Sequence, residues 1–419
     1  MDNPERNAIL AGMEKTYDLL VVGGGLNGPA LALACAQAGM RVAVIDALPA
    51  AMRSDAGFDG RGYALSLSSQ RLLKALGLWG VVGDHAQPIL DVKVTDGKIG
   101  EAPSPFMLEF DHAETDDGPM GYMLEDRYLR RAFLDAMAGE ARIEQIEGTV
   151  IAQEVGPAGI TLRLADGQEV FGRVVAGCDG RKSGTATRAG IARTGWGYGQ
   201  TALVCAIAHE KPHHGCAHQY FLPSGPLAIL PLPDNRSSIV WTEKDADAAR
   251  IAALDPEDYL TVLRPRFGDF LGEISLAGGR FSYPLNITLA NSFIAPRVAL
   301  VGDAAHGLHP IAGQGLNAGL KDVAALAEVL ADARARGEDI GREDVLARYQ
   351  QWRRFDVATL AMATDAFNRL FSNDNPFLRV ARDIGMGAVN AIPGLRRGAI
   401  REAAGITGDL PKLLKGRPL

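Results

Sequence analysis

The segment YDLLVVGGGLNGPALALACAQAGMRVAVID, residues 17–46, is the part of the sequence most informative about the fold. The apolar run over 17–22 predicts a buried strand, and the glycines that follow predict a tight turn. The Ala- and Leu-rich segment 29–38 predicts a helix, and 41–46 predicts a second buried strand. The stretch is therefore a βαβ unit of a parallel sheet. It has no charged residue from 19 to 40, but its glycines and Pro29 argue against a membrane span of that length.

The turn of this unit has the spacing of a dinucleotide-binding motif, Gly23-x-Gly25-x-x-Gly28. Gly23 makes the tight turn, Gly25 lets the backbone reach a pyrophosphate, and Gly28 lets helix and strand pack closely. The helix N-terminus adds free N–H groups and a partial positive charge. Asp46, at the end of the second strand, can accept hydrogen bonds from a ribose and disfavours a 2′-phosphate. The motif alone does not separate FAD from NAD.

Composition narrows the class of protein. The 419 residues carry a net charge of −7, which argues against a nucleic-acid partner. The 49 glycines are about 12% of the chain against a usual share of roughly 7%, so close backbone approach to a ligand is expected. The four cysteines form neither a metal-type pair nor a disulfide framework, and residues 1–18 lack the apolar region of a signal peptide. We therefore expect a cytoplasmic protein.

The order of elements predicts an α/β protein with an α+β second domain. A Rossmann-like dinucleotide domain, discontinuous in sequence, is expected over 1–87, 120–195 and 290–345. The β-type runs of 88–119 and 196–289 predict an inserted β-sheet domain for the substrate. Residues 346–419 read as a C-terminal helical region.

Two further motifs follow predicted strands. Asp303 comes directly after the short apolar run 297–301, and the glycines of 313–319 bring backbone amides to a helix N-terminus, where they can stabilise negative charge. His306 and His309 in this segment are first read as ordinary turn histidines. Asp179-Gly180 follows the strand 172–176 and is, taken alone, an ordinary turn.

In this order and spacing, the three motifs resemble the single-component FAD-dependent aromatic hydroxylases. The run 309–322 is similar to the ubiquinone-biosynthesis hydroxylases of the UbiH/UbiF type, as are 58–66 and the strands within 214–232. The resemblance implies that the first motif binds the ADP half of FAD and Asp303 the ribityl chain. It places Asp179-Gly180 between FAD and a transient NADPH site. Ala186 stands where the family has an arginine, which leaves the NADPH contact open.

The resemblance also supplies the site residues. The expected FAD contacts are Gly23, Gly25, Gly28, Asp46, Arg61, Arg127, Asp179, Gly180, Gly302, Asp303, Gly313, Gly315, Leu316 and Asn317. His309, Pro310 and Gln314 are the candidates beside the flavin ring, and the apolar candidates for the substrate are Phe221, Leu227, Ile229 and Leu230.

The implied reaction is the hydroxylation of a polyprenylated phenol of the 2-polyprenyl-6-methoxyphenol type, a ubiquinone precursor. NADPH or NADH would reduce FAD, and O₂ would give a C4a-hydroperoxide that the protein must shield from water. Three alternatives stay open: another FAD-dependent oxidoreductase of this fold (a reductase, halogenase or small-aromatic hydroxylase), an NAD-dependent dehydrogenase, and a non-catalytic flavoprotein subunit of a ubiquinone biosynthetic complex. The Asp303 motif disfavours the dehydrogenase.

Two surface features have competing interpretations. The segment 209–218 holds four histidines and Cys216, but we read it as a solvated loop and expect no metal site. Residues 376–419 carry a net charge of +5 among apolar residues. They are either a solvated helical tail or a contact with anionic lipid or partner proteins at the inner face of the membrane.

Overall fold

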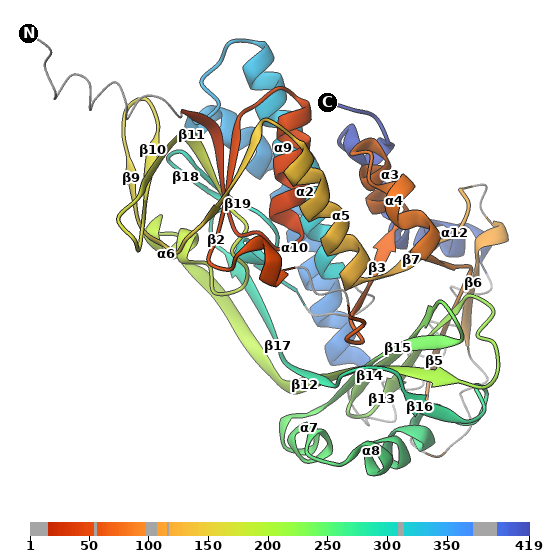
Figure 1. Ribbon diagram of the computed structural model, residues 1–419. Coiled ribbons are helices and arrows are strands. Elements are labelled where there is room, and N and C mark those ends of the chain that lie inside the picture. The colour runs from red at the N-terminus through yellow and green to blue at the C-terminus, as the bar shows by residue number, and fades with distance from the viewer. Residues whose placement is uncertain are drawn as a thin grey trace, which may run out of the picture.

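The computed structural model describes residues 16–53, 57–97, 100, 107–114, 117–308, 314–371 and 392–419. Two bodies lie one above the other: a helix-covered sheet at the top of Figure 1, and a second sheet at the bottom with helices on its lower side. This mixed α/β arrangement confirms the predicted fold class.

The upper sheet is built around the βαβ unit predicted from the sequence. β1 (Tyr17–Val22) pairs in parallel with β2 (Val42–Asp46) and with β11 (Glu169–Gly177), and α2 (Asn27–Gln37) connects β1 to β2. The sheet continues through β8 (Ile143–Glu147) on one side and β19 (Val298–Leu300) and β18 (Ile294–Ala295) on the other. β9 (Val150–Val155) and β10 (Ile160–Leu164) extend β11. Strands from 17 to 300 thus share one sheet.

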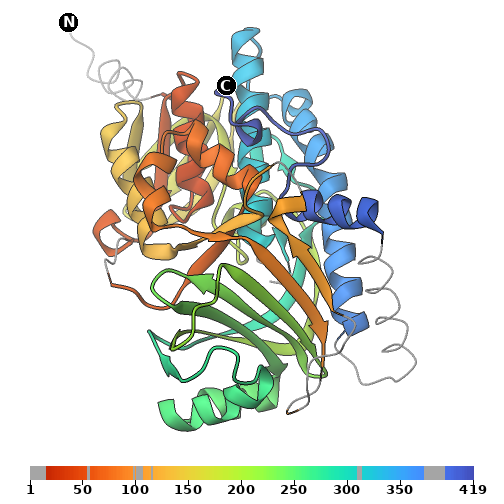
Figure 2. The same cartoon turned by 90° about the vertical axis from the view of Figure 1, so that its right-hand side faces the viewer.

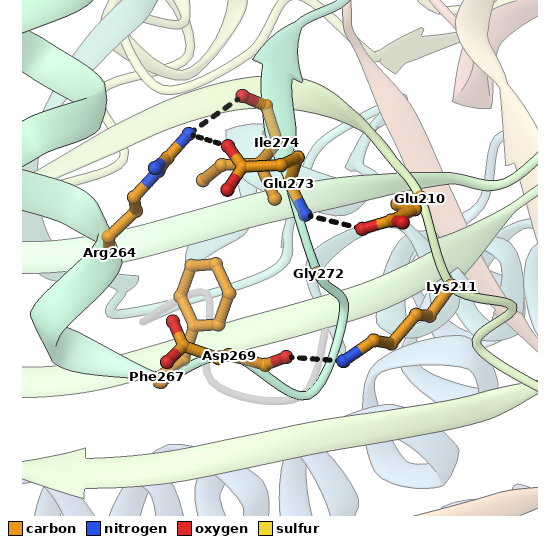
Figure 3. A pocket seen from close by; sticks show the side chains of 9 residues that line it. Glu210, Lys211, Arg264, Phe267, Asp269, Gly272, Glu273 and Ile274 are labelled. Atoms are coloured by element: carbon orange, nitrogen blue, oxygen red, sulfur yellow. Dashed lines mark hydrogen bonds and ion pairs between the residues drawn. The ribbon is translucent and has the colours of Figure 1, made fainter.

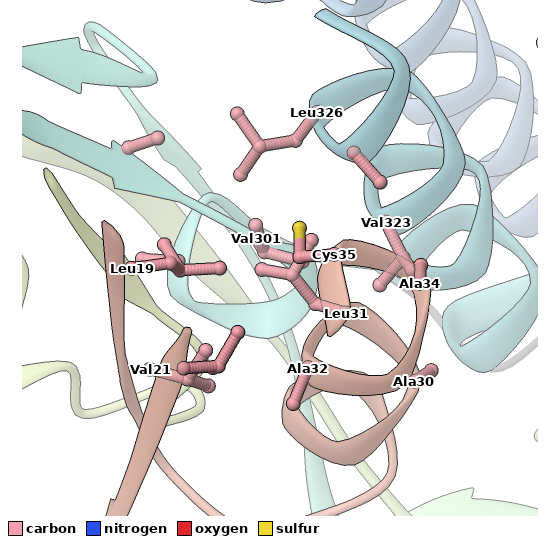
Figure 4. Packing of buried hydrophobic residues seen from close by; sticks show 14 of the residues in the cluster. Leu19, Val21, Ala30, Leu31, Ala32, Ala34, Cys35, Val301, Val323 and Leu326 are labelled. Carbon is pink, nitrogen blue, oxygen red and sulfur yellow. The ribbon is translucent and has the colours of Figure 1, made fainter. Parts of the chain in front are cut away.

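Helices from both ends of the sequence cover this sheet. α9 (Gln314–Ala335) lies beside α2, and small side chains such as Ala30 and Ala34 let the two helices approach (Figure 4). Leu19 and Val21 of β1 and Val323 of α9 are fully buried in the same core. The remaining helical elements here are η1 (Ala50–Arg53), α3 (Leu67–Ala75), α4 (Trp79–Val82), η2 (Gly83–His85), α5 (Asp126–Gly139), α6 (Gly184–Arg188), η5 (Gly302–Ala304) and α10 (Glu343–Phe371).

The lower sheet has the order β20–β17–β12–β15–β14–β13–β5–β6, and β16 pairs with β12. Its members are β5 (Asp91–Asp96), β6 (Leu108–Asp111), β12 (Arg193–His209), β13 (Cys216–Leu222), β14 (Gly225–Leu232), β15 (Arg236–Lys244), β16 (Ile274–Leu276), β17 (Phe281–Ala290) and β20 (His306–Gly307). α7 (Asp245–Ala252), α8 (Pro256–Leu263) and η4 (Arg264–Arg266) cover its lower face. A small sheet of β3 (Gly62–Ser66), β7 (Gly121–Glu125) and β4 (Gln87–Ile89) lies between the two bodies. η3 (His112–Glu114) follows β6 and precedes β7 along the chain.

Two elements differ in detail from what the sequence pattern predicts. The residues 68–79 have the pattern of a capped amphipathic helix, but α3 ends at 75, because Gly77 takes a φ of +79° and starts a turn. The β-type run that begins at 201 predicts a strand from that point, but β12 begins at Arg193, since Arg193–Gly197 pair with β17 beyond a register shift. β12 and β17 therefore run as long strands from one body to the other (Figure 1).

The C-terminal residues fold back on the upper body. α12 (Pro393–Ala403) and η7 (Leu413–Lys415) follow α10, and the end of the chain lies beside the upper body (Figure 2). Leu413 and Leu414 are buried in the upper core. The C-terminal region thus contributes to the core of the upper body. Within the described part of the chain, no helix has both the length and the apolar character that crossing a bilayer needs.

Candidate functional site

The turn between β1 and α2 is shaped by its glycines. Gly23 has a φ of +110°, and a Cβ there would collide with the carbonyl of Cys178 at the end of β11. A Cβ on Gly28 would collide with the carbonyl of Gly23. By contrast, a Cβ on Gly25 would meet none of the described residues within 4 Å, which leaves space in front of the turn. In the described part of the chain no side chain caps the N-terminus of α2, and its first turn has no acidic residue.

Asp46 and Arg53 fix this turn from the side of β2. The Asp46 carboxylate accepts hydrogen bonds from the backbone N–H of Gly24 at 2.6 Å and of Leu48 at 2.8 Å. Arg53 donates from Nη1 to the carbonyl of Gly24 at 3.2 Å. Its Nε is buried and finds no hydrogen-bond partner within the described residues. A buried cation beside a glycine-rich turn is suited to an anionic group.

Asp303 lies where the upper and lower bodies meet. It follows β19 in η5, and its half-exposed carboxylate accepts a hydrogen bond from Arg181 Nε at 3.0 Å. Arg181 also donates to the carbonyl of Leu308 at 2.9 Å and to Asn286 Oδ1 of β17 at 3.2 Å. The arginine thus joins the Asp303 turn to the lower sheet, and it was not predicted from the sequence.

Asn27 joins the first motif to the Asp303 motif. A Cβ on Gly302 or on Gly319 would collide with the Asn27 amide, so both glycines are needed for this contact. Asn27 Oδ1 is buried and has no hydrogen-bond partner in the part of the chain that the structure describes. The first turn and the Asp303 turn are therefore packed together around one polar side chain.

A buried ionic cluster supports the same turn from behind. Asp322 of α9 is fully buried and accepts hydrogen bonds from the Gly302 N–H at 2.9 Å and from His306 Nε2 at 2.5 Å. Its other oxygen accepts from Arg353 Nε of α10 at 2.8 Å. His306, read from the sequence as an ordinary turn histidine, is thus a fully buried partner of a carboxylate.

The Asp179 motif forms a helix cap. The carboxylate accepts hydrogen bonds from Ser183 Oγ at 2.5 Å and from the N–H and Oγ1 of Thr185 at 2.8 and 2.9 Å, at the start of α6. Gly180 has a φ of +75°, which the turn requires. Arg188, the arginine nearest Ala186, donates to the carbonyl of Val150 instead. The FAD contact expected of Asp179 and Gly180 stays a prediction.

The N-terminus of α9 is anchored by Asn317. Its Oδ1 accepts from the Ser66 N–H at 2.9 Å and from Ser69 Oγ at 2.8 Å, and its Nδ2 donates to the carbonyl of Ala64 at 2.8 Å. Its side chain therefore ties α9 to β3 and α3. A Cβ on Gly315 would meet nothing within 4 Å among the described residues, and Leu316 packs on the upper core. Gln314 begins α9, whereas His309, Pro310 and Gly313 lie outside the described residues.

Arg61 and Arg127 lie between the two bodies, each held by acidic groups. Arg61 donates to Asp59 at 2.7 Å, lies 3.6 Å from Asp126, and stacks over the ring of Phe281. Arg127 donates to the buried Glu125 at 2.7 Å. These contacts pre-position both guanidinium groups beside the lower sheet.

The four apolar candidates for the substrate divide between the two faces of the lower sheet. Leu227 and Ile229 are buried in the cluster formed with α7 and α8. Leu230 packs with the small sheet, and Phe221 packs with Val94 and Leu108, on the opposite face. The structure therefore does not bring the four side chains together.

Comparison with known proteins decides the family. Residues 16–364 match the FAD binding domain family. The chain is 45% identical to the ubiquinone hydroxylase UbiL of Rhodospirillum rubrum over 97% of this chain and 94% of that protein. It is 35% identical to the 3-demethoxyubiquinol 3-hydroxylase of Escherichia coli over 93% and 98% of the two chains. The chain belongs to the family of FAD-dependent ubiquinone hydroxylases. Among solved structures, PqsL of Pseudomonas aeruginosa in complex with 2-aminobenzoylacetate is similar, with a TM-score of 0.74, 25% identity, and coverage of 86% of this chain and 97% of PqsL.

Membership of this family confirms that the protein is an FAD-dependent aromatic hydroxylase, with NAD(P)H and O₂ as the typical co-substrates. The residues present fit the cofactor. The open space at Gly25, the uncapped N-terminus of α2 and the unpartnered Arg53 Nε suit a pyrophosphate, which is an anion with many acceptor oxygens. Asp46 and Asp303 are half-exposed acceptors that suit hydroxyl groups.

We expect Asp46→Ala to weaken FAD binding by about tenfold, because one charge-assisted hydrogen bond to a ribose hydroxyl is lost. Titration of the apoprotein with FAD measures the change. Asp166→Ala, in an exposed turn of the same body, serves as the control and should leave the affinity as it is. An Asp46 variant with the wild-type affinity would refute the ribose role.

The histidine-rich segment is held by ordinary hydrogen bonds. His209 contacts the carbonyl of Lys211 at 2.8 Å and Ser237 Oγ at 3.0 Å, and His213 contacts the carbonyl of Leu232 at 2.8 Å and the Gly215 N–H at 3.0 Å. Burial and the charge of Lys93 lower the pKa of His218 to about 4, so this ring is neutral at pH 7. The expectation of no metal stays a prediction.

Two surface hollows lie on the lower sheet. One, of about 470 Å³, is lined by the histidine-rich segment and Phe270. The other, of about 240 Å³, is shown in Figure 3. Its charged groups are paired within the chain: Arg264 with Glu273 at 2.8 Å, and Lys211 Nζ with the carbonyl of Asp269 at 3.3 Å. Neither hollow includes any of the predicted FAD contacts.

Proposed function

We propose that the protein hydroxylates the ring of a polyprenylated phenol in ubiquinone biosynthesis. The observation that carries this proposal is the 45% identity, over nearly the whole chain, to a ubiquinone hydroxylase. Two contacts support it: Asn27 packs the dinucleotide turn against Gly302 and Gly319, and Arg181 joins Asp303 to Asn286 of the lower sheet. A phenol of the 2-polyprenyl-6-methoxyphenol type is the proposed substrate.

The side chains of the site bind, orient and exclude water. The N-terminus of α2 and Arg53 would hold the pyrophosphate of FAD, Asp46 its ribose, and Asp303 its ribityl chain. The N-terminus of α9, which Asn317 holds in place, would offer backbone amides that favour negative charge on the flavin ring. When bound, FAD supplies the chemistry of electron transfer from NAD(P)H and of oxygen activation.

Arg61 and Arg127 lie beside this site and are proposed to contact FAD from the side of the lower sheet. Both are fixed by carboxylates, so their charged groups are already oriented before the cofactor binds. His309, Pro310 and Gln314 keep their proposed place beside the flavin ring, and Gly313, Gly315 and Leu316 their proposed backbone contacts.

Genetic complementation tests the proposal. The protein is expressed in strains each blocked at one ring hydroxylation of ubiquinone synthesis, and the accumulated intermediates are identified by mass. Restoration of ubiquinone in at least one strain is expected. If the protein binds FAD but restores none of them and shows no NAD(P)H oxidation stimulated by a prenylphenol, it is a non-catalytic subunit or an oxidoreductase for another substrate.

We further propose a peripheral contact with the membrane, where a prenylated substrate resides. Ile392 and Leu395 are about half exposed beside the arginines of α12. Two of these arginines are partly neutralised within the chain, Arg396 by Glu114 at 2.7 Å and Arg401 by Asp117 at 3.7 Å. The apolar pair therefore supplies most of the proposed contact.

Flotation with anionic vesicles tests this contact. We expect the double variant Ile392→Ser, Leu395→Ser to float less than the wild type, because both apolar contacts with the bilayer are lost. Substituting these two residues is preferable to truncating the C-terminal region, since Leu413 and Leu414 belong to the upper core. Val81→Ser, an exposed apolar residue on α4, is the control. Equal flotation of all three proteins contradicts the proposal.

A further inference from the structure

The lower sheet has one face covered by helices and one that faces the upper body. Leu203, Ile229 and Trp241 are buried in the cluster with α7 and α8. Because side chains alternate along a strand, their neighbours Val204, Ala228 and Val240 point toward the upper body. These apolar side chains are part-exposed, unlike the fully buried residues beside them in the sequence.

Strand register aligns these side chains in one row. Val204 pairs with Phe281 of β17 on one side and with Val240 of β15 on the other. The row continues from Val240 to Ala228, then to Gln219 of β13 and Val94 of β5. We call these six part-exposed residues the crossing row. It spans six neighbouring strands, or about 24 Å at a spacing of about 4.8 Å.

Both flanks of the crossing row are buried. On one side, Ala206 and Ala217 pack with Met123 of the small sheet. On the other side, Ala202, Thr242 and Phe221 are buried. α10 crosses the sheet beyond this flank, where Asn368 Nδ2 donates to Gln200 Oε1 at 3.0 Å. The crossing row is therefore a strip of accessible apolar surface between two covered regions.

One end of the crossing row meets the FAD site. The Arg61 guanidinium lies over the Phe281 ring at 5.7 Å, and Arg61 is a proposed FAD contact. At the other end the row reaches Val94, near the β5–β6 edge of the sheet. A ligand that places a ring near Phe281 can thus extend an apolar chain along the row, away from the cofactor.

We infer that the crossing row binds the prenyl tail of the phenol, with its ring end at Phe281. The inference rests on the proposed function and adds the path of the tail. An isoprenoid chain has no polar atoms, and covering accessible apolar side chains is favourable in proportion to the area removed from water. Gln219 is polar, but its Nε2 is already shielded from water and has no hydrogen-bond partner among the described residues. Covering it therefore takes no hydrogen bond away from water.

The test blocks the crossing row by placing a bulky residue in its middle. Ala228→Phe and, independently, Val240→Phe are compared with wild type on a short-tailed and a long-tailed prenylphenol. The readouts are substrate-stimulated NADH oxidation and the dissociation constant from the change in flavin absorbance, which needs no turnover. Ser282→Phe places the same bulk on an exposed position of the other face, beside Leu203, and is the control. FAD content and the melting temperature show whether each variant is folded.

We expect Ala228→Phe and Val240→Phe to lose at least about tenfold in affinity and kcat/KM for the long tail, since apolar contacts of the distal isoprene units are lost. For the short tail they should stay close to wild type. If folded variants treat both phenols alike, the tail does not follow the crossing row and the inference is wrong. If wild type responds to neither phenol, the proposed function itself fails, and the inference fails with it.

Discussion

Asp303→Ala is expected to yield a protein that purifies without FAD. In the proposed complex, the carboxylate of Asp303 accepts hydrogen bonds from the ribityl chain, and each charge-assisted bond contributes roughly 1.5–3 kcal/mol. Two such bonds correspond to a loss of affinity of about a hundredfold or more. Absorbance near the flavin bands of the purified protein, and titration of the apoprotein with FAD, measure the effect.

The fold should survive this change. Asp303 is half exposed, and Arg181 keeps its contacts with Leu308 and Asn286 when the carboxylate is removed. Asp135→Ala, an exposed carboxylate of α5, is the control and should stay yellow. An Asp303→Ala protein that is as yellow as wild type, with the same FAD affinity, would refute the assignment of Asp303.

Asp322→Asn is expected to lower the free energy of unfolding more than the other single substitutions proposed above. The substitution removes the negative charge that lies between Arg353 and His306, both of which are buried. Breaking a buried ion pair by removing one partner costs about 3–5 kcal/mol, because the other charge stays buried and uncompensated. Chemical denaturation monitored by circular dichroism measures the free energy of unfolding.

Asp356→Asn is a matched control. Asp356 also pairs with Arg353, but it is nearly half exposed, so its loss should cost less than about 1 kcal/mol. Similar losses in the two variants would mean that the buried cluster is not the support of the Asp303 turn that we describe.

The contribution of Asp322 to the stability of the fold should depend on pH. Burial alone would raise the pKa of its carboxyl, but the charges of His306 and Arg353 hold the pKa below the ordinary value of 3.8. A carboxyl with a lowered pKa stabilises the fold above its unfolded pKa, and this stabilisation is lost as the pH falls through the folded pKa. The difference between wild type and Asp322→Asn should therefore be full at pH 7 and shrink below about pH 4.

Local patterns in the sequence were enough to predict the βαβ unit of the upper body. The apolar run 17–22, the glycine turn and Asp46 lie within one βαβ unit, so their geometry follows from nearby residues. Arg53 could not be found in this way, because it contacts Gly24 from a short turn that carries no motif. The pair of Asp322 and Arg353 joins two helices, and nothing in the sequence indicates which acidic residue faces which arginine.

For the lower sheet, the sequence does not indicate which face lies toward the cofactor. Period-two alternation in β14 separates Leu227 and Ile229 from Leu230, yet it does not say which set faces the cofactor. That choice depends on where α7, α8 and the small sheet pack, which is set by tertiary contacts. The substrate candidates therefore included side chains from both faces.

Incorporation of oxygen from ¹⁸O₂ into a prenylphenol by the purified, FAD-loaded protein with NADH tests the proposed hydroxylation most directly. We expect one new hydroxyl group on the ring, carrying ¹⁸O, in amounts that match the NADH consumed. A phenol that is recovered unchanged while NADH is oxidised and hydrogen peroxide accumulates would contradict it.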